Sequence, residues 1–148
     1  MSFTDLINGG IKDAMKAKDV ARKRTLRAIK AQLLLQKTSG AEGEITKAQE
    51  IKLLQKMVKE RQDSYTIYVE QNRDDLAQPE KEEMDIIKEF LPQQMSEEEL
   101  TAGLKEIMTT VGASSMKDMG KVMGMANKQF AGKADGKMIS TIVKSLLA

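Results

Sequence analysis

The spacing of apolar residues along the chain is helical from one end to the other. These residues recur at every third or fourth position, which places them on one stripe of a helix at about 100° per residue, and no stretch shows the strict alternation of a strand. We therefore predict an all-α fold. The stripes predict a first helix after Ser2 and further helices from Asp19 to Lys37, Thr46 to Gln71, Pro79 to Phe90, Ser96 to Gly112, Met116 to Phe130 and from Asp135 onward.

Each predicted helix has an apolar stripe that we expect to face a core. In the N-terminal part these residues are Ile7, Ile11, Ala14, Met15, Leu26, Ile29, Leu33, Ile51, Leu54, Val58, Tyr65, Val69, Met84, Ile87 and Leu91. In the C-terminal part they are Leu100, Leu104, Ile107, Met108, Val111, Met119, Val122, Met123, Ala126, Phe130, Met138, Ile139, Ile142, Val143 and Leu146. Asn8-Gly9-Gly10 interrupts the first helix and should weaken it. Arg22 shares a core stripe, where its guanidinium either reaches out to solvent or pairs with an acid of another helix.

A helix stop followed at once by a helix start marks a boundary near residue 92. Pro92 cannot continue the helix that precedes it. Ser96 and Glu99 have the spacing of a capping box, in which each side chain accepts a hydrogen bond from the other residue's backbone N–H. We predict an N-terminal α-helical domain of about four helices over residues 1–92 and a small three-helix domain over residues 93–148.

The helix expected from Met116 to Phe130 has two unlike faces. Lys117, Lys121 and Lys128 fall within about 40° of one another, opposite the apolar stripe, with Gly124 among them and Gly120 beside them. A glycine inside a helix costs about 1 kcal/mol relative to alanine. The two glycines therefore indicate either close packing of another helix or a surface that a phosphate backbone can approach closely.

Charge is unevenly distributed along the chain, although the formal net charge is only +2. Residues 12–37 contain nine basic side chains against two acidic ones, and residues 112–148 contain six lysines against two aspartates. The acidic residues gather mainly between positions 42 and 106. This asymmetry permits a directed contact with an anion, although ordinary solvated helix faces also carry such charges.

Residue types that are absent exclude several kinds of active site. The chain contains no histidine and no cysteine, so it has no histidine base, thiol nucleophile or thiolate zinc site. No GxxxxGK[ST] motif is present, which excludes a P-loop. We expect no cofactor and no metal. The start, MSFTDLINGG, lacks the order of a signal peptide, no run is long enough to span a membrane, and we expect a cytoplasmic protein.

Three remaining clusters of polar residues have simpler explanations than catalysis. Glu97-Glu98-Glu99 suits the positive end of a helix dipole. Ser114, Ser115 and Lys117 could form a serine–lysine dyad, but capping explains the serines. Four acids of the fourth helix could hold a hard cation weakly or form a solvated face; they are Glu80, Glu82, Glu83 and Asp85.

Several motifs along the whole chain indicate a relation to a known family. The C-terminal part contains GASSMKDMGKVMG followed by GKADGKMISTIVKSLL, and the N-terminal part contains KDVARKRTLRAIKA, KERQDSYTIY, NRDDLA and FLPQQMSEEEL. The C-terminal motif closely resembles the signature of the YqeY-like family, and the N-terminal motifs agree with it. The Gly9-Gly10 pair departs from the usual start. The family, also called GatB/YqeY, is related to the tail of the B subunit of the tRNA-dependent amidotransferase, which converts Glu-tRNA(Gln) or Asp-tRNA(Asn) to the amide using glutamine.

This resemblance implies two helical domains and the activity term carbon-nitrogen ligase with glutamine as amido-N-donor. In the large enzyme the tail contacts tRNA, whereas other parts of the enzyme perform the reaction. This chain contains none of those catalytic parts. We therefore expect the chain alone to be non-catalytic.

Three hypotheses follow for the function of the chain. It is an RNA-binding accessory module, first of all for tRNA; a protein-interaction module that docks onto an amidotransferase or an aminoacyl-tRNA synthetase; or a participant in tRNA-dependent amidation. Little aromatic content (3%) argues against stacking on single strands, so folded RNA is favoured. The predicted RNA-binding residues are Lys117, Gly120, Lys121, Gly124, Lys128, Lys133 and Lys137.

Overall fold

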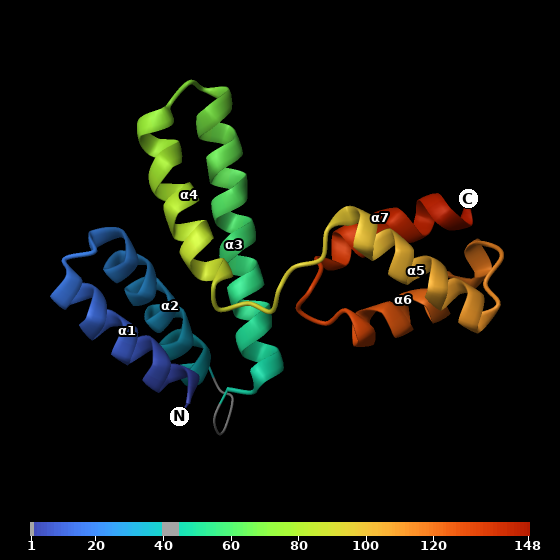
Figure 1. Cartoon of the computed structure of the whole chain (residues 1–148), viewed down its shortest axis with the longest axis horizontal. Helices are drawn as coiled ribbons and strands as arrows, with labels where there is room; N and C mark the ends of the chain where they lie inside the picture. The colour runs from blue at the N-terminus through green and yellow to red at the C-terminus, as the bar shows by residue number, and fades with distance from the viewer. Residues whose placement is uncertain (1, 40–44) are drawn as a thin grey trace. The chain divides into compact units, whose positions relative to one another are not determined.

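The computed structural model describes residues 2–39 and 45–148, and within these ranges every regular element is a helix (Figure 1). The elements are α1 (Phe3–Ala17), α2 (Val20–Thr38), α3 (Lys47–Glu70), α4 (Asp74–Lys88), α5 (Glu97–Val111), the short 3₁₀ helix η1 (Met116–Asp118), α6 (Met119–Gln129) and α7 (Gly136–Leu147). The predicted all-α fold is confirmed.

The chain divides into two compact units, Met1–Leu91 and Pro92–Ala148. The N-terminal unit consists of two helical hairpins, α1 with α2 and α3 with α4, and α2 packs against α4 (Figure 1). Its core contains Ile7, Leu26, Ile29, Leu33, Leu54, Met57 and Ile87.

The first helix is continuous through its glycines, contrary to the interruption that we predicted. Ser2 and Asp5 form a capping box at its start. A Cβ on Gly10 would lie 2.9 Å from Leu26 Cδ1, whereas a Cβ on Gly9 would meet nothing within 4 Å. Gly10 therefore lets α1 and α2 approach closely, and this packing offsets the low helix propensity of the pair.

Arg22 pairs with an acid of another helix, so the second of the two possibilities is correct. Its Nη1 lies 2.7 Å from Glu89 Oε2, and its guanidinium carbon lies 6.0 Å from the centre of the Phe90 ring. The Phe90 ring in turn meets Phe3 edge to face at 6.0 Å. One arginine thus connects α2 to the end of α4, where an aromatic pair reaches α1.

The fourth helix begins five residues before the predicted start at Pro79. It starts at Asp74, so Pro79 is the sixth helical residue rather than a first-turn residue. A proline near a helix start disturbs only the carbonyl four residues earlier, here that of Asp75. Asp74 and Asp75 stabilise the positive end of the helix dipole, and the side chain of Asp75 also binds Arg73 at 2.9 Å.

The C-terminal unit packs α5, α6 and α7 around its own core. The buried residues are Leu100, Leu104, Ile107, Val122, Ala126, Phe130, Ala134, Ile139, Ile142, Val143 and Leu147. The ring of Phe130 lies over Gly103, where a Cβ would come within 2.7 Å of Phe130 Cζ. Gly103 therefore makes room for the largest side chain of this core.

Several positions on the predicted stripes are exposed, and four buried apolar positions were missed. Met15, Val69 and Met138 are 53%, 43% and 40% exposed. The missed buried residues are Met57, Ala77, Ala134 and Leu147. A stripe drawn at fixed angles does not take into account that packing against other helices is lost at the end of a helix. Val69 is an example, because it lies in the last turn of α3.

The predicted boundary between two domains leads to a proteolysis test. Gln94 Nε2 donates to the carbonyl oxygen of Gly132 at 2.7 Å, and the Met95 N–H donates to that of Lys133 at 2.8 Å. Residues 94 and 95 thus belong to the second unit, which leaves residues 91–93 as the connection. We expect brief digestion with a broad-specificity protease to cut there and to leave two helical fragments, identified by mass spectrometry. First cleavage inside α6 would show that the boundary is misplaced.

Candidate nucleic-acid interface

The lysines of α6 lie on the side of the helix that faces away from the core. Lys121 and Lys128 are exposed, whereas Val122 and Ala126 are fully buried on the opposite side. Seven residues of helix separate the two lysines by about 10 Å along the axis. Lys117, also exposed, precedes them in η1 rather than in the predicted single helix.

Gly120 and Gly124 lie in open space beside these lysines. A Cβ at either position would meet no atom within 4 Å, in contrast to the crowded position of Gly103. This finding excludes close helix packing within the described chain as the reason for the two glycines. Because α6 starts at Met119, Gly124 is the one inside the helix, and Gly120 lies in its first turn.

The carboxylate of Asp118 fixes the turn that leads into α6. It accepts hydrogen bonds from the backbone N–H groups of Ser114 at 3.0 Å and Ser115 at 3.3 Å. These backbone bonds, with a smaller contribution from the charge of Lys121, hold the pKa of Asp118 below its usual value. Asp118 thus closes the turn onto the backbone of the two serines, and Ser115 is the N-cap residue of η1, as the capping explanation predicted. Lys117 and Lys121 lie one residue before and three residues after Asp118.

The other two predicted lysines lie where α6 connects to α7. Lys133 and Lys137 are both exposed. The backbone of Lys133 is fixed by the bond from Met95, and Lys137 lies in the first turn of α7, which Asp135 caps. Lys128, in the last turn of α6, is near this end in sequence. The seven predicted residues thus follow η1, the open face of α6 and the start of α7.

None of these five lysines forms an ion pair within 4.0 Å in the part of the chain that the structure describes. All seven ion pairs found there belong to residues 22–89 of the N-terminal unit. The charges of the five lysines are therefore available to an external anion.

Exposed methionines lie near these lysines in the sequence. Apolar periodicity wrongly assigned one of the methionines, Met138, to the core. Met116, Met125 and Met138 are 47%, 38% and 40% exposed. The angle of Met125 on the helix, near the lysines, is the signal that finds it from sequence. Methionine is flexible and polarisable and adapts to irregular contact surfaces.

The acids of α4 are largely engaged by arginines. Glu83 lies 3.5 Å from Arg24 and 3.8 Å from Arg61, and Glu82 lies 3.5 Å from Arg24. Burial raises the pKa of Glu80, and the nearby charge of Glu83 adds to this. In the described residues, no group of three or more acids is placed to hold a metal ion.

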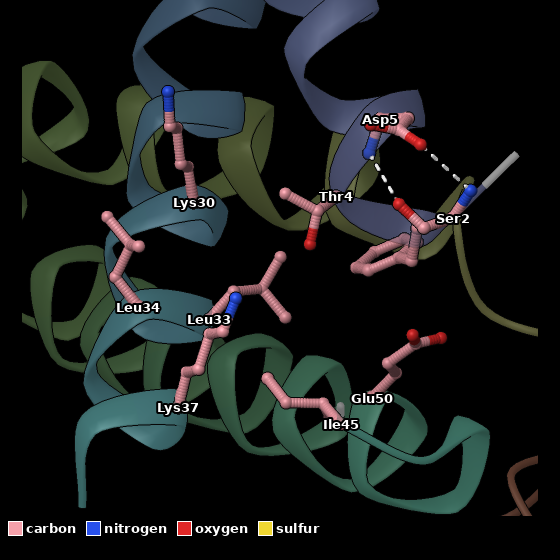
Figure 2. A pocket seen from close by; sticks show the side chains of 10 residues that line it. Ser2, Thr4, Asp5, Lys30, Leu33, Leu34, Lys37, Ile45 and Glu50 are labelled. Carbon is pink, nitrogen blue, oxygen red and sulfur yellow. Dashed lines mark hydrogen bonds between the residues drawn. The ribbon is translucent and has the colours of Figure 1, made fainter. Parts of the chain in front are cut away.

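A hollow of about 250 Å³ lies in the N-terminal unit, where the start of α1, the end of α2 and the start of α3 meet (Figure 2). Lys30 and Lys37 line it from α2, and Leu33 contributes apolar surface. Asp5 and Glu50 line it from α1 and α3. The carboxylate of Asp5 is already bound to the backbone N–H of Ser2 (Figure 2). Burial raises the pKa of Glu50.

Comparison with known protein families identifies the chain. The family model described as Yqey-like protein matches residues 4–147. The chain belongs to the YqeY-like family. The match covers both units, from the second residue of α1 to the end of α7.

Two fungal relatives carry the same name, altered inheritance of mitochondria protein 41, mitochondrial. The protein from Clavispora lusitaniae is 32% identical over 141 residues, which cover 92% of this chain and 82% of the relative. The protein from Lachancea thermotolerans is 30% identical over 107 residues, which cover 71% of this chain and 57% of the relative. Their names describe a mitochondrial location for those proteins, and a cytoplasmic location for this chain stays a prediction.

Among the described helices, none is both long and apolar enough to cross a membrane.

Replacing glycines tests whether the lysine face is open. Gly124→Ala should raise the free energy of unfolding by about 0.5–1 kcal/mol, because alanine has the higher helix propensity and its methyl group meets nothing. Gly103→Ala should lower it by about 1–3 kcal/mol, because the methyl group collides with Phe130. Urea unfolding followed by circular dichroism measures both. A loss of stability in Gly124→Ala would mean that another helix covers this face.

The turn held by Asp118 predicts a pH-dependent stability. Because the folded-state pKa lies below the unfolded value of about 4, the folded protein binds fewer protons in this range. The contribution of the carboxylate is therefore present above pH 4 and is lost as the pH falls through the folded-state pKa.

Asp118→Asn should thus unfold at lower urea concentration than the wild type at pH 7, and the difference should shrink toward pH 3. Asp13→Asn is the control, because Asp13 is exposed on α1 and makes no hydrogen bond or ion pair among the described contacts. Equal effects of both variants at pH 7 would contradict the role of Asp118.

Proposed function

We propose that the C-terminal unit binds the phosphate backbone of a folded RNA, first of all a tRNA, through η1, the open face of α6 and the start of α7. The observation that supports this most directly is the environment of Gly120 and Gly124, which are open to solvent beside lysines that make no ion pair within 4.0 Å in the described part of the chain. Residues without side chains let a phosphate backbone come close to a helix, and the lysines supply the positive charge.

The composition of this face favours folded RNA over single strands. Single-strand binding uses exposed aromatic side chains on which bases stack. The one aromatic residue of the C-terminal unit, Phe130, is buried in its core. Double-stranded RNA is recognised mainly by its shape and its phosphates, which needs basic side chains and few aromatic ones.

The resemblance to the amidotransferase tail is consistent with this role. In that enzyme the tail contacts tRNA and other parts carry out the reaction. We propose that this chain acts beside such an enzyme or a related one, and that it has no glutamine-dependent ligase activity of its own. The absence of histidine and cysteine supports this view, because it removes a thiol nucleophile and a histidine base. Ser114 and Ser115, the candidates for a serine–lysine dyad, belong to the turn that Asp118 closes.

The second candidate function is docking onto an amidotransferase or an aminoacyl-tRNA synthetase. The observation that favours it is the exposure of Met116 and Met125 in the η1–α6 segment. An adaptable apolar surface of this kind suits a partner helix.

Neutralising the lysine face tests the RNA proposal. In the Lys117→Gln, Lys121→Gln, Lys128→Gln triple variant, we expect weaker tRNA binding at low salt. Each lost phosphate contact should flatten the slope of log affinity against log salt by about 0.7–0.9, so the triple variant should lose two to three units of slope. The fold should be retained, because surface substitutions usually change stability by about 0.5 kcal/mol or less. Fluorescence anisotropy with labelled tRNA at several salt concentrations measures affinity and slope.

Gly124→Leu provides a second arm that leaves every charge in place. A bulky side chain on the open face should block close approach and weaken tRNA binding, while circular dichroism stays unchanged. If tRNA binding survives both the triple variant and Gly124→Leu, the RNA site is not on α6. Loss of a co-purifying protein that resists nuclease treatment, in these same variants, would favour the docking function instead.

A further inference from the structure

A second row of cations, which make no ion pair among the described residues, follows one side of α2 in the N-terminal unit. Lys23, Arg27, Lys30 and Lys37 are spaced by four, three and seven residues, which keeps them within about 80° on the helix. From first to last they span about 21 Å of the helix axis. Figure 2 shows Lys30, Leu34 and Lys37 following one another on this side. We call these four residues the α2 stripe.

The α2 stripe differs from the other two arginines of the same helix. Arg22 and Arg24 are paired with Glu89, Glu82 and Glu83 of α4. Within the described residues, the four members of the stripe make no such pair. The helix itself contains no acid between Val20 and Thr38. α2 therefore uses some of its cations to hold the fold, while the others make no ion pair in the described structure.

The acids that face the stripe from neighbouring helices form no ion pair with it in the described structure. Asp5 and Glu50 line the hollow beside Lys30 and Lys37 (Figure 2), but neither lies within ion-pair distance of them in the described structure. Asp5 is bound to Ser2. Asp19, at the start of α2, accepts a hydrogen bond from the backbone N–H of Arg22 at 3.0 Å.

The surroundings of the α2 stripe indicate which polyanion fits. Leu26, Ile29 and Leu33, which lie beside the stripe on the helix, are enclosed in the core, so the main apolar side of α2 is not available to insert into a bilayer as in membrane-surface helices. Leu34 is an exposed apolar side chain between Lys30 and Lys37, which is why vesicles are included among the probes below. A row of cations on a rigid, packed helix instead suits a row of phosphates held at fixed spacing, as in a helical RNA.

We propose that the α2 stripe is a second contact for the RNA backbone. The RNA thus binds to both units of the chain rather than to the C-terminal unit alone. This inference rests on the proposed function of the lysine face of α6 and extends its contact surface to a different unit. Joining two contacts in one chain makes the second an intramolecular event, so both contribute to the overall affinity.

The experiment compares three matched triple variants of the full chain. The α2 variant carries Lys23→Gln, Arg27→Gln and Lys30→Gln, and the α6 variant carries Lys117→Gln, Lys121→Gln and Lys128→Gln. The control carries Lys52→Gln, Lys56→Gln and Lys59→Gln on α3, which removes the same charge from exposed positions near acids such as Glu60. Circular dichroism and urea unfolding verify that each variant is folded. The probes are unfractionated tRNA and, separately, vesicles of phosphatidylcholine with phosphatidylserine.

The inference predicts that the α2 variant loses two to three units of the salt-dependence slope for tRNA, as the α6 variant does, and that the control keeps the wild-type slope. Combining the α2 and α6 changes should remove about twice as much slope as either set alone.

Each other outcome has a separate meaning. If the α6 variant is weakened while the α2 variant binds tRNA like the wild type or like the control, this inference fails and the proposed function stands. If the α2 variant alone is weakened, the stripe is the RNA site and the α6 site fails. If the wild type does not bind tRNA at low salt, both fail. Vesicle binding that depends on the stripe, with unchanged tRNA binding, would assign it to a lipid surface and overturn the inference.

Discussion

The packing of Phe130 over Gly103 determines which side of α6 is buried in the C-terminal unit and which side is exposed to a partner. A unit of this size buries little apolar surface and is only marginally stable, so each large core residue matters. The aromatic ring holds the end of α6 against α5, and Val122 and Ala126 complete the same buried side. Because one side of α6 makes all of its contacts with the core, the side chains on the other side are not needed for packing. Glycines, and lysines that make no ion pair in the described structure, can lie there without affecting the core.

In the N-terminal unit, α2 likewise uses one side to pack against other helices and leaves another side for contact with a partner. Its ion pairs with α4 are partly exposed, and such pairs contribute about 0–1 kcal/mol each. The arrangement of Arg61 adds little to stability, because its buried Nε has no hydrogen-bond partner among the described atoms and lies 3.8 Å from Glu83. These contacts are better understood as fixing how the two hairpins fit together. Apolar residues such as Leu26 and Ile87, which are fully buried, provide most of the cohesion.

The sequence predicted the helices well because their apolar periodicity and caps are local signals. Ser2 and Thr46 form capping boxes at the helix starts that the sequence predicted, and Ser96 makes one of the two bonds of its predicted capping box. The errors occur where the local structure depends on a contact with a residue far away in the sequence. Gly10 is tolerated because Leu26 lies above it, and Arg22 turns toward Glu89, a partner 67 positions away. The site shows the same limit, since a glycine that a helix covers and a glycine left open look identical in sequence, and only the structure distinguishes Gly103 from Gly124.

The net charge of +2 hides this organisation, because acids and bases are sorted by position rather than mixed. The acids of α4 neutralise the arginines of α2 that hold the fold, while the cations on the outer sides of α2 and α6 have no such partner in the described structure. On our proposal, a polyanion is attracted to these two faces and not to the protein as a whole, which gives orientation as well as affinity. On the same proposal, a chain without histidine or cysteine contributes to tRNA-dependent chemistry by holding the RNA in place, and its resemblance to an amidotransferase tail reflects a shared contact surface without requiring a shared reaction.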